Sequence, residues 1–348
     1  MQLSDVERAA MRRALALGKS VRGSTSPNPP VGAVILTADG TLAGEGATAP
    51  VGGPHAEVVA LAAAGDGARG GTAVVTLEPC AHTGRTGPCT QALLDAGVAK
   101  VIYAVDDPNP AASGGAAVLR EAGVTVVSGA LAREAEAGAM RAWLHAVRTA
   151  RPFVTWKYAA TLDGRVAAAD FSARWISSAA SRADAHALRA EVDAIVVGSG
   201  TVLADDPSLT ARDSDGELLD RQPLRVVLDR RHRVPQSAQV LDGAAETLVL
   251  DTAVPRFALK ALFDRGVRHV LLEGGPTLAG AFVEARCVDE VIAYLAPTLL
   301  GDGPSALGHA GIGSLAEAVT LEVQSVSRTG GDIKVVGRPI WAEPAGER

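Results

Sequence analysis

Short apolar runs alternate with amphipathic segments along the whole chain. The runs have the length and the β-branched content of buried strands, and the segments between them repeat apolar residues with a helical period. In the first half, this pattern predicts strands at residues 31–37, 72–78, 98–105 and 124–129 and helices at 4–18, 54–64, 89–96, 113–122 and 131–148. Asp39-Gly40 predicts a hairpin turn after the first strand. Such an alternation is typical of a three-layer α/β/α domain.

A second alternating series follows Arg151-Pro152, where the proline disfavours helical backbone at the residue before it. This series predicts strands at residues 153–161, 193–200, 224–229, 247–251, 268–275, 288–297 and 332–338 and helices at 178–190, 256–265 and 276–285. We therefore expect two α/β domains, residues 1–149 and 150–348. The connections 205–223 and 298–319 have the length at which loops are more often functional than ordinary.

Composition agrees with two packed α/β domains. The 348 residues are 47% hydrophobic but only 3% aromatic, which suits tight layers of Ala, Gly and Val better than an aromatic-rich all-β fold. The net charge of -6 gives no broad basic surface, so we expect no nucleic-acid partner. A small anionic substrate needs only local positive charge.

Several features favour a cytoplasmic protein without a membrane partner. The three cysteines, Cys80, Cys89 and Cys287, are too few and odd in number for a disulfide framework. The first residues carry charges throughout their apolar pattern, unlike a signal peptide. No apolar run reaches the roughly 18 residues that span a bilayer. We also expect the chain to form a homo-oligomer.

Three side chains of types that bind zinc lie in the first half: His55, Cys80 and Cys89. A structural zinc site usually has four protein ligands, whereas a catalytic site has three and leaves the fourth position to water. Glu57 lies two residues after the histidine, and a carboxylate there suits proton transfer from an activated water. Cys89 would begin a helix, whose dipole favours a thiolate. This set predicts a hydrolytic zinc centre.

Other interpretations fit the same residues taken alone. Cys80 and Cys89 could be two buried free cysteines, and His82 could complete a structural zinc site. The zinc-deaminase pattern H-x-E…P-C-x-x-C is met only in part, because the eight residues 81–88 separate the two cysteines.

The longer text around the cysteines is more specific. Residues 76–89 read TLEPCAHTGRTGPC, preceded by SPNPPVG at 26–32 and followed by DDPNP at 106–110. These strings resemble the deaminase half of the RibD family, bifunctional enzymes of riboflavin biosynthesis. The resemblance implies a cytidine-deaminase-like fold in which His55, Cys80 and Cys89 bind zinc and Glu57 moves the proton. It implies that the substrate is a phosphoribosylated diaminopyrimidinone, which Asn28 could bind by hydrogen bonds and which His82 and Arg85 could contact.

The second half has no G-x-G-x-x-G after a strand, so it lacks the sequence pattern that predicts a Rossmann dinucleotide-binding fold. Residues 274–278, GGPTL, instead lie between an apolar strand and a helix. Backbone amides at such a helix start can bind the phosphates of a dinucleotide, although Gly-Gly-Pro is also an ordinary turn.

Several longer strings resemble the reductase half of the same family. They read KYAATLDGRVA (157–167), RWISS (174–178), DAIVVGSGTVLADDPSLTAR (193–212), RVVLD (225–229), LEGGPTLAGAF (272–282) and APTLLG (296–301). The resemblance spans nearly the whole chain and implies a dihydrofolate-reductase-like fold that uses NADPH. The cofactor contacts that it implies are Ala159, Trp175, Thr201, Asp205, Gly275, Pro276, Thr277, Leu278, Ala279, Gly280 and Ala281. The substrate contacts that it implies are Arg189, Leu209, Arg212 and Glu273.

The implied reduction converts a ribosylamine to a ribitylamine, by hydride addition at C1′ of an opened imine. A proton donor or acceptor is needed, and we expect it among Lys157, Asp205 and Glu273. Guanidinium groups such as Arg189 and Arg212 suit the substrate phosphate. Phe171, Ala173 and Met140 depart from the residues usual in the family.

Two other functions remain open from the sequence. One is a nucleic-acid or nucleoside deaminase with an accessory nucleotide-binding domain, which the acidic balance and the few aromatic residues for base stacking disfavour. The other is a structural zinc module fused to a nucleotide sensor, which the presence of only three clear ligands disfavours.

Overall fold

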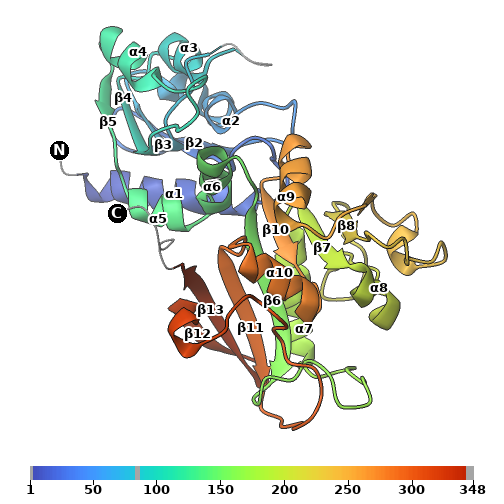
Figure 1. Ribbon diagram of the computed structural model, residues 1–348. Helices are drawn as coiled ribbons and strands as arrows, with labels where there is room; N and C mark the ends of the chain where they lie inside the picture. The colour runs from blue at the N-terminus through green and yellow to red at the C-terminus, as the bar shows by residue number, and fades with distance from the viewer. Residues whose placement is uncertain (1–2, 83–86, 342–348) are drawn as a thin grey trace, which may run out of the picture. The chain divides into compact units, whose positions relative to one another are not determined.

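Two separate β-sheets organise the computed structural model, which describes residues 3–82 and 87–341 (Figure 1). The chain divides into two compact units, Met1–Arg151 and Pro152–Arg348, with one sheet in each. Among the described residues, no helix is both long enough and apolar enough to cross a membrane.

The first unit has a five-stranded sheet in the order β2-β1-β3-β4-β5. Strand β1 is antiparallel to β2 and β3, whereas β3, β4 and β5 are parallel. Its strands are β1 Gly32–Leu36, β2 Leu42–Ala47, β3 Thr72–Leu77, β4 Lys100–Val105 and β5 Thr125–Val127. Its helices are α1 Asp5–Ser20, α2 Ala56–Ala64, α3 Cys89–Asp95, α4 Gly115–Glu121, α5 Ala132–Ala137 and α6 Arg141–Thr149, with a 3-10 turn at Gly65–Ala68.

Helices cover both faces of this sheet. In Figure 1, α2, α3 and α4 lie on one side of the sheet, and α1 and α5 lie on the other. Ser4 caps α1 by accepting the Glu7 amide at 3.2 Å, and the Glu7 carboxylate accepts the Ser4 amide in return at 2.9 Å. The predicted three-layer α/β/α architecture is confirmed.

Gly115 lets α4 approach the segment that carries Cys80. A Cβ at this position would lie 1.8 Å from the carbonyl oxygen of Pro79, which leaves no room for any side chain. We expect Gly115→Ala to push α4 away and to lower the free energy of unfolding by about 1–3 kcal/mol. Denaturant titration measures this loss. Gly87→Ala is the control, because a Cβ there has nothing within 4 Å; equal stability of the two variants would contradict the close packing.

The second unit has an eight-stranded sheet in the order β12-β13-β11-β6-β10-β7-β8-β9. The six strands from β11 to β9 are parallel, and β13 is antiparallel to both β11 and β12. Its strands are β6 Phe153–Thr161, β7 Ala194–Gly198, β8 Leu224–Leu228, β9 Thr247–Leu250, β10 His269–Leu272, β11 Glu290–Ala296, β12 Thr320–Thr329 and β13 Asp332–Ile340. Its helices are α7 Ala179–Ala190, α8 Ser199–Asp205, α9 Pro255–Asp264 and α10 Pro276–Glu284, with 3-10 turns at Gln239–Leu241 and Leu315–Glu317.

Alternating side chains of the parallel strands form two hydrophobic cores. On β7, Ala194 and Val196 belong to the core that includes α9 and α10, while Ile195 and Val197 belong to the core that includes Val202 of α8. This two-sided burial explains why the strands read as continuous apolar runs. The predicted dihydrofolate-reductase-like α/β fold is confirmed.

Two predicted elements differ from the structure, and one strand of the structure was not predicted. The single helix expected at 131–148 is two helices, because Gly138 leaves the helical region between α5 and α6, with a φ of -90° and a ψ of -131°. The strand expected at 193–200 ends at Gly198, and Ser199–Asp205 is helical. Strand β12 was not predicted, because its polar residues and exposed side chains give no apolar alternation.

Candidate functional site

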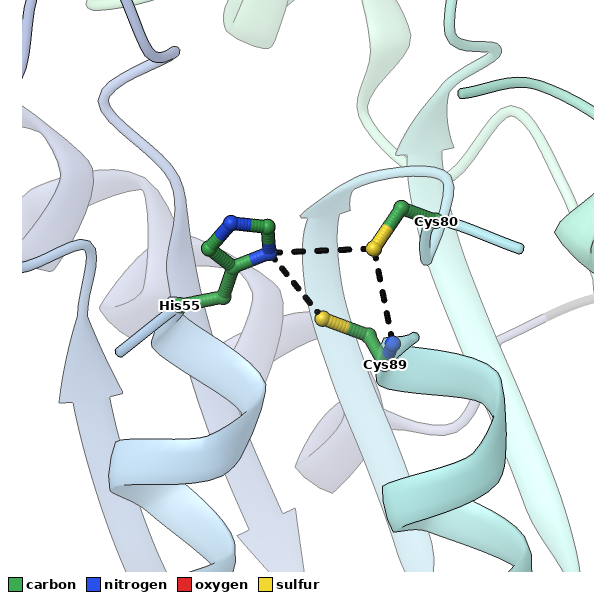
Figure 2. Close-up of side chains that lie close together, drawn as sticks. All are labelled: His55, Cys80 and Cys89. Atoms are coloured by element: carbon green, nitrogen blue, oxygen red, sulfur yellow. Dashed lines mark hydrogen bonds between the residues drawn. The ribbon is translucent and has the colours of Figure 1, made fainter. Parts of the chain in front are cut away.

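The three predicted zinc ligands come from the ends of three different elements. His55 is the N-cap of α2, Cys80 follows β3, and Cys89 is the first residue of α3. Figure 2 shows the imidazole of His55 and the thiols of Cys80 and Cys89 directed toward one another. Both thiols are buried. The site thus joins two helix N-termini to the carboxyl end of a strand.

The spacing of the three ligand atoms fits a zinc ion. The His55 Nδ1 lies 3.2 Å from the Cys89 Sγ and 3.7 Å from the Cys80 Sγ. With ordinary zinc–nitrogen and zinc–sulfur bonds, two ligand atoms at tetrahedral angles lie about 3.6 Å apart. No further His, Cys, Asp or Glu belongs to the group in the parts of the chain that the structure describes. A set of one nitrogen and two sulfurs with an open fourth position suits catalytic zinc.

Backbone contacts hold the two cysteines in place. The Cys89 amide donates to the Cys80 Sγ at 3.4 Å, and the Thr90 amide donates to the Cys80 carbonyl oxygen at 3.2 Å. Glu78, buried two residues before Cys80, accepts the Ala116 amide at 2.9 Å and the Asp107 amide at 3.2 Å. The cysteines are therefore positioned by the ends of β3, β4, α3 and α4 together.

The electrostatics of the ligands favour a bound cation. The hydrogen bond with Cys89 lowers the pKa of the Cys80 thiol to about 4, with a further contribution from His55, and the same contact raises the pKa of Cys89. The hydrogen bond with Cys80 raises the pKa of His55. A bound zinc ion would deprotonate both thiols, because coordination deprotonates a thiol.

Glu57 lies in the first turn of α2, next to these ligands. Its side chain is buried, and burial raises its pKa to about 6. The charges of Cys80 and His55 and a hydrogen bond with Cys89 also act on it, which places the carboxylate beside the ligand cluster. A carboxylate with such a pKa can both accept and release a proton near neutral pH.

The other residues predicted for this half are less defined. The main chain of Asn28 is fixed by Thr25, since the Asn28 amide donates to the Thr25 carbonyl oxygen at 2.9 Å and the Thr25 hydroxyl donates to the Asn28 carbonyl oxygen at 3.0 Å. His82 is exposed and does not belong to the ligand cluster. Arg85 lies outside the described residues.

A second group of predicted residues meets in the other unit. Glu273, directly after β10, accepts two hydrogen bonds from Arg189 of α7, from Nε at 2.7 Å and from Nη2 at 2.8 Å. Arg189 also donates from Nη1 to the Thr210 carbonyl oxygen at 3.1 Å. Lys157 of β6 lies close enough for its charge to act on both members of the pair. Two of the three guanidinium nitrogens of Arg189 are therefore engaged with the Glu273 carboxylate.

These contacts fix the charges of the group. Burial alone would raise the pKa of Glu273, but the charge and hydrogen bonds of Arg189, together with Lys157 and His186, lower it to about 2. Burial lowers the pKa of Lys157, which the charge of Glu273 opposes. Glu273 is thus ionised at neutral pH and cannot donate a proton, while the lowered pKa of Lys157 makes its ammonium a stronger acid than an ordinary lysine.

The segment expected to bind a dinucleotide forms the start of α10. Gly275 is its N-cap and Pro276 its first residue, but the Gly275 amide already donates to the Thr201 hydroxyl at 3.1 Å. Ala279 is fully buried in the core, and a Cβ at Gly280 would lie 2.0 Å from the His309 carbonyl oxygen. Ala279 and Gly280 therefore serve packing. Thr277 and Leu278 complete the first turn of the helix, and Ala281 after it is partly buried.

The remaining predicted residues lie in loops, in β6 or in α8. Trp175 is 68% exposed, with the Arg182 guanidinium 4.5 Å from the centre of its ring. The Asp205 carbonyl oxygen accepts a hydrogen bond from Arg174 at 2.5 Å. Leu209 is buried with a φ of 51°. Arg212 donates to the Gly216 carbonyl oxygen at 2.7 Å, while Ala159 lies within β6.

The sequence did not single out Asp184, Tyr294 and Lys334, which contact one another beside Lys157. They lie on α7, β11 and β13, and nothing in their local sequence distinguishes them from surface or core residues. Because side chains alternate along a strand, the sequence could have predicted which residues share a face with Tyr294 on β11. It could not have predicted which residues of other elements contact Tyr294.

Comparisons with known proteins cover both units. The model of the RibD C-terminal domain matches residues 152–335, and the model of the cytidine and deoxycytidylate deaminase zinc-binding region matches residues 4–105. The riboflavin biosynthesis protein RibD of Mycobacterium tuberculosis is 52% identical over 324 residues, which cover 93% of this chain and 95% of that protein.

Two solved structures agree with these matches. RibD of Acinetobacter baumannii is 37% identical with a TM-score of 0.87 and covers 96% of this chain and 99% of its own. The diaminohydroxyphosphoribosylaminopyrimidine deaminase/5-amino-6-(5-phosphoribosylamino)uracil reductase of Thermotoga maritima is 32% identical with a TM-score of 0.89, at the same coverage of 96% and 99%.

Proposed function

This chain belongs to the RibD family of bifunctional riboflavin-biosynthesis proteins, and from that premise we propose how its residues carry out the two reactions. The chain is a zinc-dependent deaminase and an NADPH-dependent reductase. It first deaminates 2,5-diamino-6-(5-phosphoribosylamino)pyrimidin-4(3H)-one and then reduces the ribosyl group to give 5-amino-6-(5-phosphoribitylamino)uracil. We assign the deaminase to residues 1–149 and the reductase to residues 150–348.

The observation that supports the deaminase most strongly is the convergence of three ligand atoms within 4.8 Å of one another, next to a buried carboxylate. His55, Cys80 and Cys89 would hold zinc, which when bound supplies a Lewis acid that lowers the pKa of a water. Glu57 takes a proton from that water as its oxygen attacks the amine-bearing carbon of the pyrimidine. The same carboxyl then delivers the proton to the leaving nitrogen, so that the carbon–nitrogen bond breaks and ammonia departs.

For the reductase, we propose that Lys157 is the proton donor. NADPH supplies the hydride that C1′ of the opened imine accepts, and the nitrogen takes up one proton to become the ribitylamine. Glu273 stays ionised beside Arg189, so its role is to hold the lysine and the substrate by charge and hydrogen bonds. Asp205 is exposed at the end of α8, and we propose that it contacts the NADPH cofactor, as do Thr201 and Trp175.

The ion pair also bears on substrate binding. Because Arg189 is engaged with Glu273, we propose that Arg212 binds the substrate phosphate and that Arg189 positions the Glu273 carboxylate. Asn28 binds the pyrimidine in the deaminase half. We further propose that the protein acts in the cytoplasm on this small phosphoribosyl substrate, as a homo-oligomer and without a nucleic-acid partner.

Replacing Lys157 by methionine tests the reductase assignment. We expect NADPH oxidation with 5-amino-6-(5-phosphoribosylamino)uracil to fall by about 10²-fold or more, because the proton donor is lost. Ammonia release by the other half should be unchanged. Lys260→Met is the control, since Lys260 pairs with Asp264 on the exposed surface of α9. Full reductase turnover in Lys157→Met would exclude the assignment.

A further inference from the structure

Tyr294 is held in one position by a buried set of polar contacts. Its side chain is fully buried on β11, and its hydroxyl donates to the Asp184 Oδ2 at 2.6 Å. The Lys334 ammonium donates to the same oxygen at 2.6 Å. Burial and the Asp184 charge both raise the pKa of Tyr294, so its hydroxyl stays protonated and keeps donating. Three elements, α7, β11 and β13, thus fix one aromatic ring.

Two ammonium groups lie near this ring. The Lys334 Nζ is 5.6 Å from the ring centre and the Lys157 Nζ is 5.7 Å from it, both within the range of a cation–π interaction. The sheet register explains the arrangement. Tyr294 is paired with Lys334 on β13 and with Ala159 on β6, and Lys157 lies two residues before Ala159 on the same face.

Lys157 itself lies among charges of both signs. Glu273 after β10 attracts its ammonium, while Arg189 of α7 repels it. Lys334 on β13 adds a second positive charge beyond the ring, which the Asp184 carboxylate balances. The ammonium is carried on a flexible four-carbon stem, so each contact that it makes helps to fix its position. The electron-rich face of Tyr294 supplies one such contact from β11.

We propose that Asp184, Tyr294 and Lys334 form a positioning unit that holds the Lys157 ammonium in the reductase site. Asp184 accepts the hydrogen bond of the tyrosine hydroxyl, and the Lys334 ammonium balances the charge of Asp184. The ring makes the cation–π contact with the Lys157 ammonium. None of the three is assigned a contact with substrate or cofactor, and they act through Lys157. The inference rests on the proposed role of Lys157 as proton donor.

Variants of Tyr294 test this unit. Tyr294→Leu removes the ring, and we expect the reductase kcat to fall by about tenfold, with the KM for NADPH changed little. The ring stabilises the charged form of Lys157, so its loss lowers the lysine pKa. Because activity requires the protonated lysine, the high-pH limb of the kcat profile should move to lower pH. Tyr294→Phe keeps the ring but frees it from Asp184, and should give a smaller change in the same direction.

Tyr103→Phe is the matched control, because Tyr103 likewise donates to an aspartate, Asp106, at 2.7 Å, but in the other unit. It should leave the reductase kcat and its pH profile unchanged. If Tyr294→Leu does not fold, as judged by circular dichroism and by ammonia release, Tyr294→Phe decides the question by its own pH profile.

Three results would overturn the inference in distinguishable ways. An unchanged kcat and pH limb in the folded Tyr294 variants, with Lys157→Met inactive, would refute the positioning unit alone. A fall in kcat without movement of the pH limb would show a merely structural role for Tyr294. Full activity of Lys157→Met would refute the proposed role of the lysine and the inference with it.

Discussion

Replacing Cys89 by alanine is expected to remove the bound zinc and to reduce ammonia release by more than about 10³-fold. Only His55 and Cys80 would remain as ligands, and two ligands are one fewer than catalytic zinc sites use. Without the metal there is no Lewis acid to lower the pKa of the attacking water. The Cys89 side chain is fully buried, and no further His, Cys, Asp or Glu of the described residues belongs to the three-ligand group. Reduction of the deaminated substrate should continue.

Zinc content by elemental analysis and ammonia release measure the two parts of this prediction. Cys287→Ala is the matched control, because Cys287 is equally buried but lies in the other unit. That variant should keep one zinc per chain and full ammonia release. A Cys89→Ala protein that still held stoichiometric zinc and released ammonia at the normal rate would contradict the ligand assignment.

Replacing Glu57 by glutamine is expected to reduce ammonia release by about 10³-fold while leaving the zinc content unchanged. The amide has nearly the same shape, but it can neither accept the proton of the water nor return it to the leaving nitrogen. General acid–base catalysis by one positioned group typically contributes about 10²–10⁴-fold, and Glu57 serves in both directions. Zinc should stay bound because His55, Cys80 and Cys89 are untouched.

Glu45→Gln is the control for this change, since Glu45 pairs with Arg13 at the surface of the same unit. It should release ammonia at the normal rate. If Glu57→Gln kept more than a tenth of the normal turnover with zinc in place, another group would have to move the proton.

The zinc cluster could be predicted from the sequence because its signals are local. Cys80 and Cys89 each follow a proline, Cys80 comes three residues after the apolar strand β3, and Cys89 and His55 come at the starts of helices. Since β3 and β4 are parallel neighbours, loops that follow them meet at one edge of the sheet. The insertion between the cysteines carried the family resemblance, although part of it lies outside the described residues.

The charged group of the reductase could be predicted only in part. Family resemblance implied Arg189 and Glu273, and the need for a proton donor or acceptor pointed to Lys157. No local pattern shows that an arginine from α7 would bind a glutamate after β10 across 84 positions of sequence. Because Arg189 is engaged with Glu273, we propose that it positions the site and does not bind the phosphate. Tyr294, Asp184 and Lys334 escaped prediction for the same reason, because their contacts depend on sheet register rather than on sequence spacing.

The errors in secondary structure have similar causes. Gly138 interrupts an otherwise helical pattern, and glycine in a helix is tolerated often enough that its presence does not decide the break. Strand β12 is almost entirely exposed, so it is held by hydrogen bonds to β13 and lacks the apolar face that predicts strands.

The most direct test of the account is to follow ammonia and NADPH in one reaction with the unmodified protein and the diaminopyrimidinone substrate. Without NADPH, we expect ammonia alone, in an amount equal to the substrate consumed. With NADPH, we expect both ammonia and an equal amount of oxidised cofactor, the second signal lagging behind the first. Oxidation of NADPH without ammonia, or failure to release ammonia from this substrate, would contradict a chain that deaminates with one site and reduces with the other.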